Sequence, residues 1–267
     1  MAAQTPVSKK IYLETILNGR DEFFRAVSMH QALPHSYFFE DATRTIYMSG
    51  VKYAPCNGVI DKSGELKEHE IDDIIDQFRN VKLPFLWWGG SQLLESKGLH
   101  FSGHFKGICL DLNRPVSTEQ PKIESLEVKP TATLQELNDF TNILATNFEL
   151  APDVAQQLMK VLEIAQQKEN LVNLVAYVNG VPVGTITLFL GTIAGIWNLS
   201  ILPDYRNKGI GMALTRAAIK VAKQREYDHM MAVLMPQGSA WNLCATLGCG
   251  EVCDIPCYID NLTGETL

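Results

Sequence analysis

The sequence reads Ile201-Leu-Pro-Asp-Tyr-Arg-Asn-Lys-Gly-Ile-Gly-Met-Ala-Leu214 at the point that decides the fold. An apolar run ends at Pro203-Asp204, which predicts a strand followed by a turn. The segment Arg206-Asn-Lys-Gly-Ile-Gly211 then opens a long pattern with helical spacing. Glycines let a backbone approach a ligand closely, and a helix N-terminus attracts anions. The stretch therefore predicts a loop that binds phosphate groups.

Three phosphate-binding patterns compete for this loop. The P-loop string G-x-x-x-x-G-K-[ST] does not occur in the sequence. The dinucleotide pattern G-x-G-x-x-G fails because Leu214 stands where the third glycine is required. The pattern R-x-x-G-x-G, after a strand, a proline and a tyrosine, matches at Arg206, Gly209 and Gly211. This combination resembles the acyl-CoA loop of the GCN5-related N-acetyltransferase (GNAT) family.

The order of predicted elements after residue 123 also resembles that family. The resemblance implies an α/β (α+β) fold, with a mixed central sheet flanked by helices over residues 123–267. The expected strands lie at 125–128, 171–179, 183–190, 196–202, 229–235 and 251–259, and the expected helices at 134–147, 152–168, 210–225 and 239–247.

The first part of the chain resembles a degenerate copy of the same lobe. Apolar residues at helical spacing predict a helix over 68–79, with short helices at 23–27 and 91–97 and strands at 45–51, 83–90 and 108–112. No R-x-x-G-x-G occurs there. The polar stretch over 113–121, with prolines at positions 115 and 121, predicts a linker, which we place at 116–122. We therefore expect a GNAT-like N-terminal lobe over 1–115 without the CoA loop, and an acetyltransferase domain over 123–267; a lid of unrelated fold is the alternative.

Composition limits the function. Hydrophobic residues make up 46% and charged residues 20%, as in ordinary globular proteins, and a net charge of −7 argues against nucleic acid as a partner. No apolar run reaches the length of a membrane span, and the first ten residues lack the apolar core of a secretory signal, so we expect a cytoplasmic protein. Six cysteines occur, at positions 56, 109, 244, 249, 253 and 257, and the spacing of the last three fits no zinc site. We expect buried reduced thiols without metal, with a metal site or a disulfide as the alternative.

The resemblance implies a reaction and a donor. An amine attacks the thioester of acetyl-CoA directly, and the amine belongs to a small molecule or a peptide N-terminus. The residues that the family motif assigns to the cofactor are Leu199, Ser200, Ile201, Arg206, Asn207, Lys208, Gly209, Ile210 and Gly211. A non-catalytic acyl-CoA-binding protein is the alternative. The sequence does not indicate the oligomeric state.

The expected catalytic residues depart from the family pattern. Cys244 stands where family members often have a tyrosine, four residues before a glycine. A thiol can protonate the leaving CoA thiolate, although packing alone also explains a cysteine there. Tyr258 is a second candidate acid. No Asp or Glu occurs over 192–198, so Glu149 is the candidate base, with Asp153 better explained as the start of a helix.

Substrate selection is expected from the N-terminal lobe. Asn57, Trp87 and Trp88 are the residues predicted to bind the acceptor, because an exposed tryptophan pair can stack on a ligand or enclose it. Burial of both tryptophans in the core of a strand is the competing interpretation.

Overall fold

A computed structural model describes residues 6–29, 31–90, 93–115, 123–168 and 170–260. These residues form two compact units. Unit 1 contains the described residues of Met1–Glu22 and Lys106–Cys253, and unit 2 those of Phe23–Phe105 and Asp254–Leu267. The linker expected at 116–122 lies outside the described residues, and the expected lobe limits of 1–115 and 123–267 stay a prediction.

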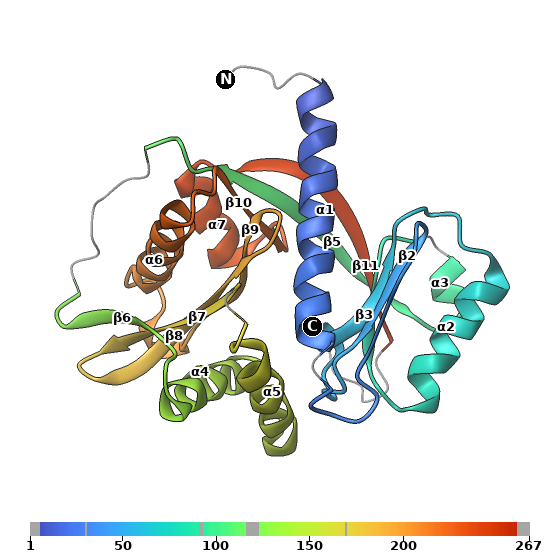
Figure 1. Ribbon diagram of the computed structural model, residues 1–267, viewed down its shortest axis with the longest axis horizontal. Coiled ribbons are helices and arrows are strands. Elements are labelled where there is room, and N and C mark those ends of the chain that lie inside the picture. The colour runs from blue at the N-terminus through green and yellow to red at the C-terminus, as the bar shows by residue number, and fades with distance from the viewer. Residues whose placement is uncertain (1–5, 30, 91–92, 116–122, 169, 261–267) are drawn as a thin grey trace. The chain divides into compact units, whose positions relative to one another are not determined.

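Unit 1 contains a mixed sheet whose strands lie in the order β6-β7-β8-β9-β10-β5 (Figure 1). The pairs β6/β7, β7/β8, β8/β9 and β10/β5 are antiparallel, whereas β9/β10 is parallel. The strands are β5 (His100–Asp111), β6 (Leu126–Pro130), β7 (Leu171–Val178), β8 (Val181–Leu190), β9 (Ala194–Ile201) and β10 (His229–Leu234).

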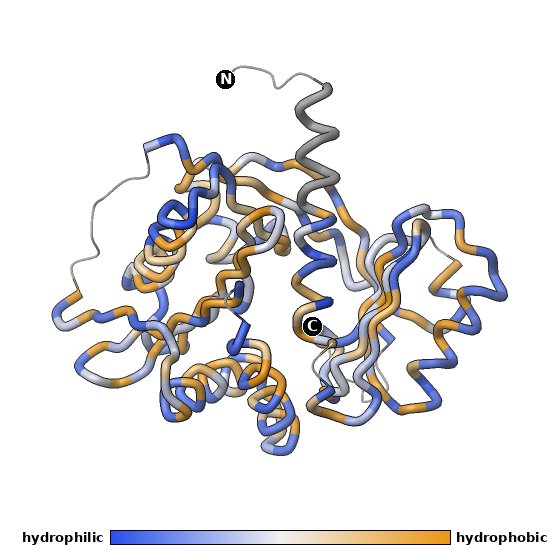
Figure 2. Tube along the Cα trace, viewed as in Figure 1, coloured by the Kyte–Doolittle hydropathy of each residue, from blue (hydrophilic) through white to orange (hydrophobic). Residues whose placement is uncertain are grey.

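Helices cover both faces of this sheet (Figure 1). On one face lie α4 (Leu134–Asn147) and α5 (Pro152–Ala165), and on the other lies α6 (Ile210–Gln224) with α7 (Gly238–Leu247) beside it. Apolar and polar segments alternate along α4 and α5 in Figure 2, as expected of helices that bury one side. Thr133 and Glu136 form the predicted capping box that starts α4. Pro152 occupies the first turn of α5.

The strands of unit 2 lie in the order β1-β2-β3-β4-β11. The pair β3/β4 is parallel and the other neighbours are antiparallel. Four isoleucine and phenylalanine side chains of α2 pack with β2, β3 and β4 in one core. The elements are α1 (Pro6–Ser28), β1 (Tyr37–Glu40), β2 (Arg44–Met48), η1 (Ala54–Cys56), β3 (Asn57–Asp61), α2 (Glu68–Asn80), β4 (Phe85–Trp88), α3 (Leu93–Ser96) and β11 (Gly250–Asp260). Three elements, α1, β5 and β11, contribute residues to both units.

The same order of elements occurs twice along the chain. The run β1-β2-β3-α2-β4-α3-β5 repeats as β7-β8-β9-α6-β10-α7-β11, and each run has a parallel central pair, β3/β4 or β9/β10. The last strands are exchanged: β5 pairs with β10, and β11 pairs with β4. The mixed sheet flanked by helices that the sequence predicts is confirmed.

Three elements differ from the sequence prediction. The short helix expected at 23–27 is the end of the 23-residue helix α1. Strands β1 and β3 were not predicted, and β3 begins with Asn57-Gly58, a pair typical of turns. Packing explains why β3 forms a strand in spite of this pair. A Cβ atom on Gly58 would lie 2.5 Å from the Leu86 carbonyl oxygen and 2.5 Å from the Tyr47 hydroxyl, so only glycine lets the backbone lie this close.

Candidate active site

Strands β9 and β10 separate soon after they begin. They pair only at Ala194 with Met230 and at Gly195 with Met231, although β9 continues to Ile201. The other edge of β9 pairs with β8 as far as Ile201. Within the described residues, no strand pairs with the β10-facing edge of β9 beyond Gly195. The backbone N–H and C=O groups of such an edge can bind an extended ligand chain by hydrogen bonds.

A β-bulge in β9 accompanies this separation. Asn198 and Leu199 together face Ile186 of β8, and Asn198 has a φ of 53°. The Thr185 hydroxyl donates a hydrogen bond to the Asn198 carbonyl oxygen at 2.9 Å, and the Asn198 amide donates to the Thr187 hydroxyl at 3.1 Å. A bulge bends its strand, and these two bonds fix the bend at one position.

The bulge is tied to a buried polar network. The Thr187 hydroxyl donates to the Asn173 side-chain oxygen at 2.7 Å, and neither residue is more than 2% exposed. Hydrogen bonds between buried groups hold one geometry because breaking one leaves an unpaired polar atom. The sequence interpretation missed this network. The available signal was Asn198 itself, because asparagine is rare within strands and tolerates a left-handed conformation.

The predicted loop follows β9 directly. Arg206 donates from Nε to the Ile201 carbonyl oxygen at 3.1 Å and from Nη2 to the Asn147 side-chain oxygen at 2.8 Å. The Lys208 Nζ lies 5.2 Å from the centroid of the Tyr205 ring, within the range of a cation–π contact. Both cations are therefore held beside the end of β9, with their side chains exposed.

The N-terminus of α6 is open to an anion. Gly209 precedes the helix with a φ of 82°, no side chain caps the helix, and its first turn has no acidic residue. The first N–H groups of a helix have no partner within the helix. Asn207 is also left-handed, with a φ of 59°. This arrangement of N–H groups and positive charge suits a diphosphate.

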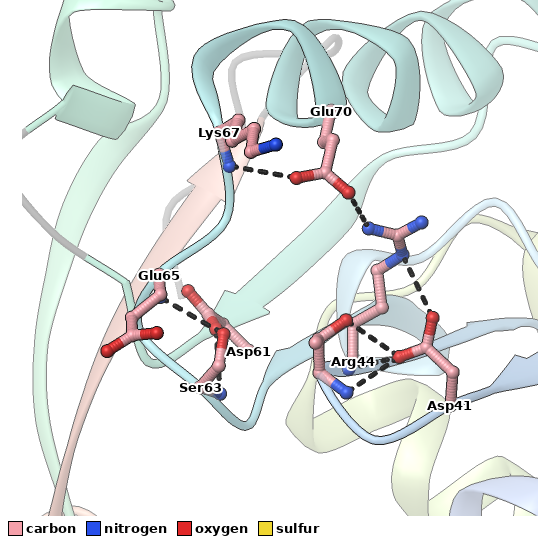
Figure 3. Close-up of polar contacts among 8 residues, drawn as sticks. Asp41, Arg44, Asp61, Ser63, Glu65, Lys67 and Glu70 are labelled. Carbon is pink, nitrogen blue, oxygen red and sulfur yellow. Dashed lines mark hydrogen bonds and ion pairs between the residues drawn. The ribbon is translucent and has the colours of Figure 1, made fainter.

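The corresponding helix of unit 2 is closed. Glu68 and Glu70 lie in the first turn of α2. The Glu70 carboxylate accepts a hydrogen bond from the Lys67 backbone N–H at 3.0 Å and another from Arg44 Nη1 at 2.8 Å (Figure 3). A carboxylate at this point satisfies the helix N-terminus and repels phosphate. In addition, β3 and β4 pair at three positions and each is at most five residues long, so they do not separate as β9 and β10 do.

The residues expected at the cofactor lie together in unit 1. Leu199, Ser200 and Ile201 form the bulged end of β9, and the Arg206–Gly211 loop follows after η2 (Pro203–Tyr205). A Cβ atom on Gly211 would lie 3.7 Å from Leu243 Cδ2, which places α7 next to the first turn of α6. Their contact with a cofactor stays a prediction.

The three candidate catalytic residues lie in different settings. Cys244 is on α7, half-buried, and a hydrogen bond with the Cys249 thiol lowers its pKa. Glu149 is exposed just after α4 and has a φ of 50°. Tyr258 lies in the core of unit 2, where burial raises its pKa. Their catalytic roles stay predictions. Asp153 lies in the first turn of α5, as expected of a residue that starts a helix.

The three residues expected to bind the acceptor are buried in unit 2. Asn57 and Trp87 are 0% exposed and Trp88 is 7% exposed. The burial of the two tryptophans agrees with the competing interpretation, in which both lie in the core of a strand. The Asn57 side-chain oxygen accepts from the Ser49 N–H at 3.0 Å, and its amide donates to the Val51 carbonyl oxygen at 2.8 Å. These bonds give Asn57 a structural role, and its contact with a substrate stays a prediction.

No helix among the described residues has both the length and the apolar character of a membrane span. No three of their His, Cys, Asp and Glu side chains gather into a group that could hold a metal ion.

Residues 137–249, which include β9, the loop, α6 and α7, match the acetyltransferase (GNAT) family. The chain therefore carries a GNAT domain. Members of this family generally transfer acetyl groups from acetyl-CoA to amines. No curated protein sequence matches this chain.

Solved GNAT structures share the fold over most of the chain. A GCN5-related N-acetyltransferase from Kribbella flavida has 12% identity and a TM-score of 0.62, covering 95% of this chain and 97% of its own. Another, from Sphaerobacter thermophilus, has 13% identity and a TM-score of 0.62, covering 82% of this chain and 77% of its own. A tandem GNAT protein from the clavulanic acid biosynthesis pathway has 13% identity and a TM-score of 0.52, covering 82% of this chain and 78% of its own.

Proposed function

We propose that this protein is an acetyl-CoA-dependent N-acetyltransferase whose acceptor is the amine of a small molecule or a peptide N-terminus. The observation that carries the proposal is the separation of β9 from β10 directly before the uncapped N-terminus of α6. An open strand edge suits the amide-containing pantetheine arm, and an open helix N-terminus suits the diphosphate of the same molecule.

Each part of the loop has a role in this proposal. The N–H groups of Gly209, Ile210 and Gly211 bind diphosphate oxygens, and Arg206 and Lys208 offset their charge. The backbone of Leu199, Ser200 and Ile201 pairs with the pantetheine and orients the thioester. Holding two reactants in line supplies much of the rate enhancement that such a reaction requires.

The chemical step needs two proton transfers. The amine nitrogen attacks the thioester carbon, the carbon–sulfur bond breaks, and the CoA thiolate takes a proton. We assign that proton to the Cys244 thiol, because Cys244 stands next to Leu243, which lies beside the first turn of α6. The amine must lose a proton, and Glu149 is the assigned acceptor.

A second candidate function is acyl-CoA binding without catalysis. Cys244 replaces the tyrosine that the family often uses, and residues 192–198 contain no Asp or Glu. A domain that kept its donor loop and lost its acid and base would have this pattern.

Calorimetric titration with acetyl-CoA tests the donor site. We expect Gly209→Glu to abolish binding, because it places a negative charge where the diphosphate binds. Lys208→Ala should weaken binding about fivefold, as expected for one exposed charge. Lys220→Ala is the matched control, because this exposed lysine of α6 lies beyond the first turn and should leave the affinity unchanged. Binding that persists in Gly209→Glu would refute both proposed functions.

A CoA-release assay separates the two functions. The panel contains polyamines, amino acids, aminoglycosides and peptides with free N-termini, each compared with hydrolysis in the absence of amine. Release stimulated by one amine class supports the transferase and names its acceptor. Tight acetyl-CoA binding with no stimulated release supports the binding module.

A further inference from the structure

The C-terminus of α7 brings two cysteines together. Gly248 follows the helix with a φ of 78°. The Cys249 N–H donates to the Cys244 carbonyl oxygen at 3.0 Å, and the Gly248 N–H donates to the Ala245 carbonyl oxygen at 3.1 Å. These two bonds define a Schellman motif, in which the side chains at the positions of Cys244 and Cys249 contact each other.

Helices α2 and α3 are among the helices that end in the same way, and they show what this contact normally is. At the end of α2, the Leu83 N–H donates to the Phe78 carbonyl oxygen at 3.1 Å, and at the end of α3 the Leu99 N–H donates to the Leu94 carbonyl oxygen at 3.1 Å. All four side chains are buried in one apolar core. In α7 the two equivalent positions are both cysteine, so the motif pairs two thiols.

The backbone geometry allows a disulfide at this position. The 3.0 Å bond from the Cys249 nitrogen to the Cys244 oxygen limits the separation of the two Cα atoms to no more than about 7 Å. Disulfides span about 4.4–6.8 Å between Cα atoms, so little backbone movement is required.

The two thiols also have shifted pKa values. The hydrogen bond between them lowers the pKa of Cys244 and raises that of Cys249, because one thiol stabilises the other's thiolate and the second proton is then harder to remove. Both side chains are half-buried, and no residue of α7 is fully buried, so a small oxidant can reach them. Cys109 differs, because burial raises its pKa to about 12.

We propose that Cys244 and Cys249 form a reversible dithiol–disulfide pair that responds to peroxide. The Cys244 thiolate attacks hydrogen peroxide, giving a sulfenic acid and hydroxide. The Cys249 thiol then attacks the sulfenic sulfur, forming the sulfur–sulfur bond, and the departing oxygen leaves as water. Peroxide is reduced, the two thiols are oxidised, and a dithiol reductant reverses the change by thiol–disulfide exchange.

Mass spectrometry of the full-length protein tests the pair. After limited treatment with hydrogen peroxide and alkylation of the remaining thiols, we expect loss of two hydrogen atoms and a cross-link between the peptides that carry Cys244 and Cys249. Dithiothreitol should restore both thiols. Cys253→Ser is the matched control, a half-buried cysteine on β11, and should still form the cross-link.

Variants of the pair make the proposal falsifiable. Cys249→Ser should stop the reaction at a sulfenic acid on Cys244, which dimedone traps, while circular dichroism confirms that the variant is folded. A cross-link between Cys249 and Cys109, or oxidation of Cys244 without any cross-link in the unmodified chain, would overturn the proposal.

The consequence for activity rests on the proposed function. A Cys244 bonded to Cys249 has no thiol proton to donate, so peroxide should slow acetyl transfer and dithiothreitol should restore it. The cross-link is measured without any activity, so failure of the transferase assay and failure of the thiol pair are distinguishable.

Discussion

Replacing Gly209 with alanine tests the conformation on which the donor loop depends. Gly209 has a φ of 82° immediately before α6. A left-handed conformation costs a residue with a Cβ atom about 1–2 kcal/mol. This cost appears as lost stability where the loop keeps its shape, and as weaker acetyl-CoA binding where the loop relaxes in the free protein. The two losses together should therefore amount to about 1–2 kcal/mol.

Gly211→Ala is the matched control in the same loop. A Cβ atom there has Leu243 Cδ2 at 3.7 Å as its nearest neighbour, an ordinary contact. Alanine within a helix is more stabilising than glycine by about 0.5–1 kcal/mol. This variant should therefore match or exceed the unmodified protein in stability and bind acetyl-CoA with similar affinity.

Two measurements on each variant give the sum of its losses in folding stability and in acetyl-CoA binding free energy. Urea denaturation followed by tryptophan fluorescence gives the free energy of unfolding, and calorimetry gives the affinity for acetyl-CoA. For Gly209→Ala, a pure stability effect corresponds to a fall in Tm of about 2–8 °C. A summed loss below about 0.5 kcal/mol, or an equal loss in Gly211→Ala, would refute the role assigned to the left-handed glycine.

Three further variants test other features. Asn57→Ala should lower the free energy of unfolding by about 2–4 kcal/mol, measured in urea, because it removes the hydrogen bonds that the buried Asn57 side chain makes to three backbone groups. Glu149→Gly should raise the free energy of unfolding by about 0.5–1 kcal/mol, because glycine suits the positive φ at this position. The same variant should release CoA more slowly if Glu149 is the base. Glu136→Gln should reduce the loss of Tm on acidification. Hydrogen bonds from the Ala132 N–H, and then from Thr133, lower the pKa of Glu136 from 4.5, so its stabilising contribution is present above that value and disappears as the pH falls through the lowered pKa.

Each of these variants has a discriminating outcome. An Asn57→Ala protein of unchanged stability would contradict the buried network, and one of unchanged stability with weaker substrate binding would favour the substrate role. A less stable Glu149→Gly protein would show that the side chain makes a contact worth more than the backbone strain. Parallel pH profiles for Glu136→Gln and the unmodified protein would contradict the capping assignment.

Local sequence signals located most elements of unit 1. The helix predicted over 134–147 is α4 with the same bounds, because Thr133 and Glu136 form a capping box whose atoms lie within four residues. The loop was predicted for the same reason, since glycines, cations and a helix start lie next to one another in the chain. Unit 2 was less predictable, because strand β3 depends on the close approach of Leu86 and Tyr47 to Gly58.

The sequence by itself predicted the phosphate-binding loop and the GNAT domain, because both predictions depend on residues that are adjacent in the chain. Only the tertiary structure decided that β9 separates from β10, that Asn198 forms a bulge held by Thr185 and Thr187, and that Trp87 and Asn57 are buried. These features depend on pairing and packing between segments far apart in the sequence. The pairing of Cys244 with Cys249 stands between the two cases. The residues lie five positions apart, yet their contact depends on the left-handed Gly248 that closes the helix.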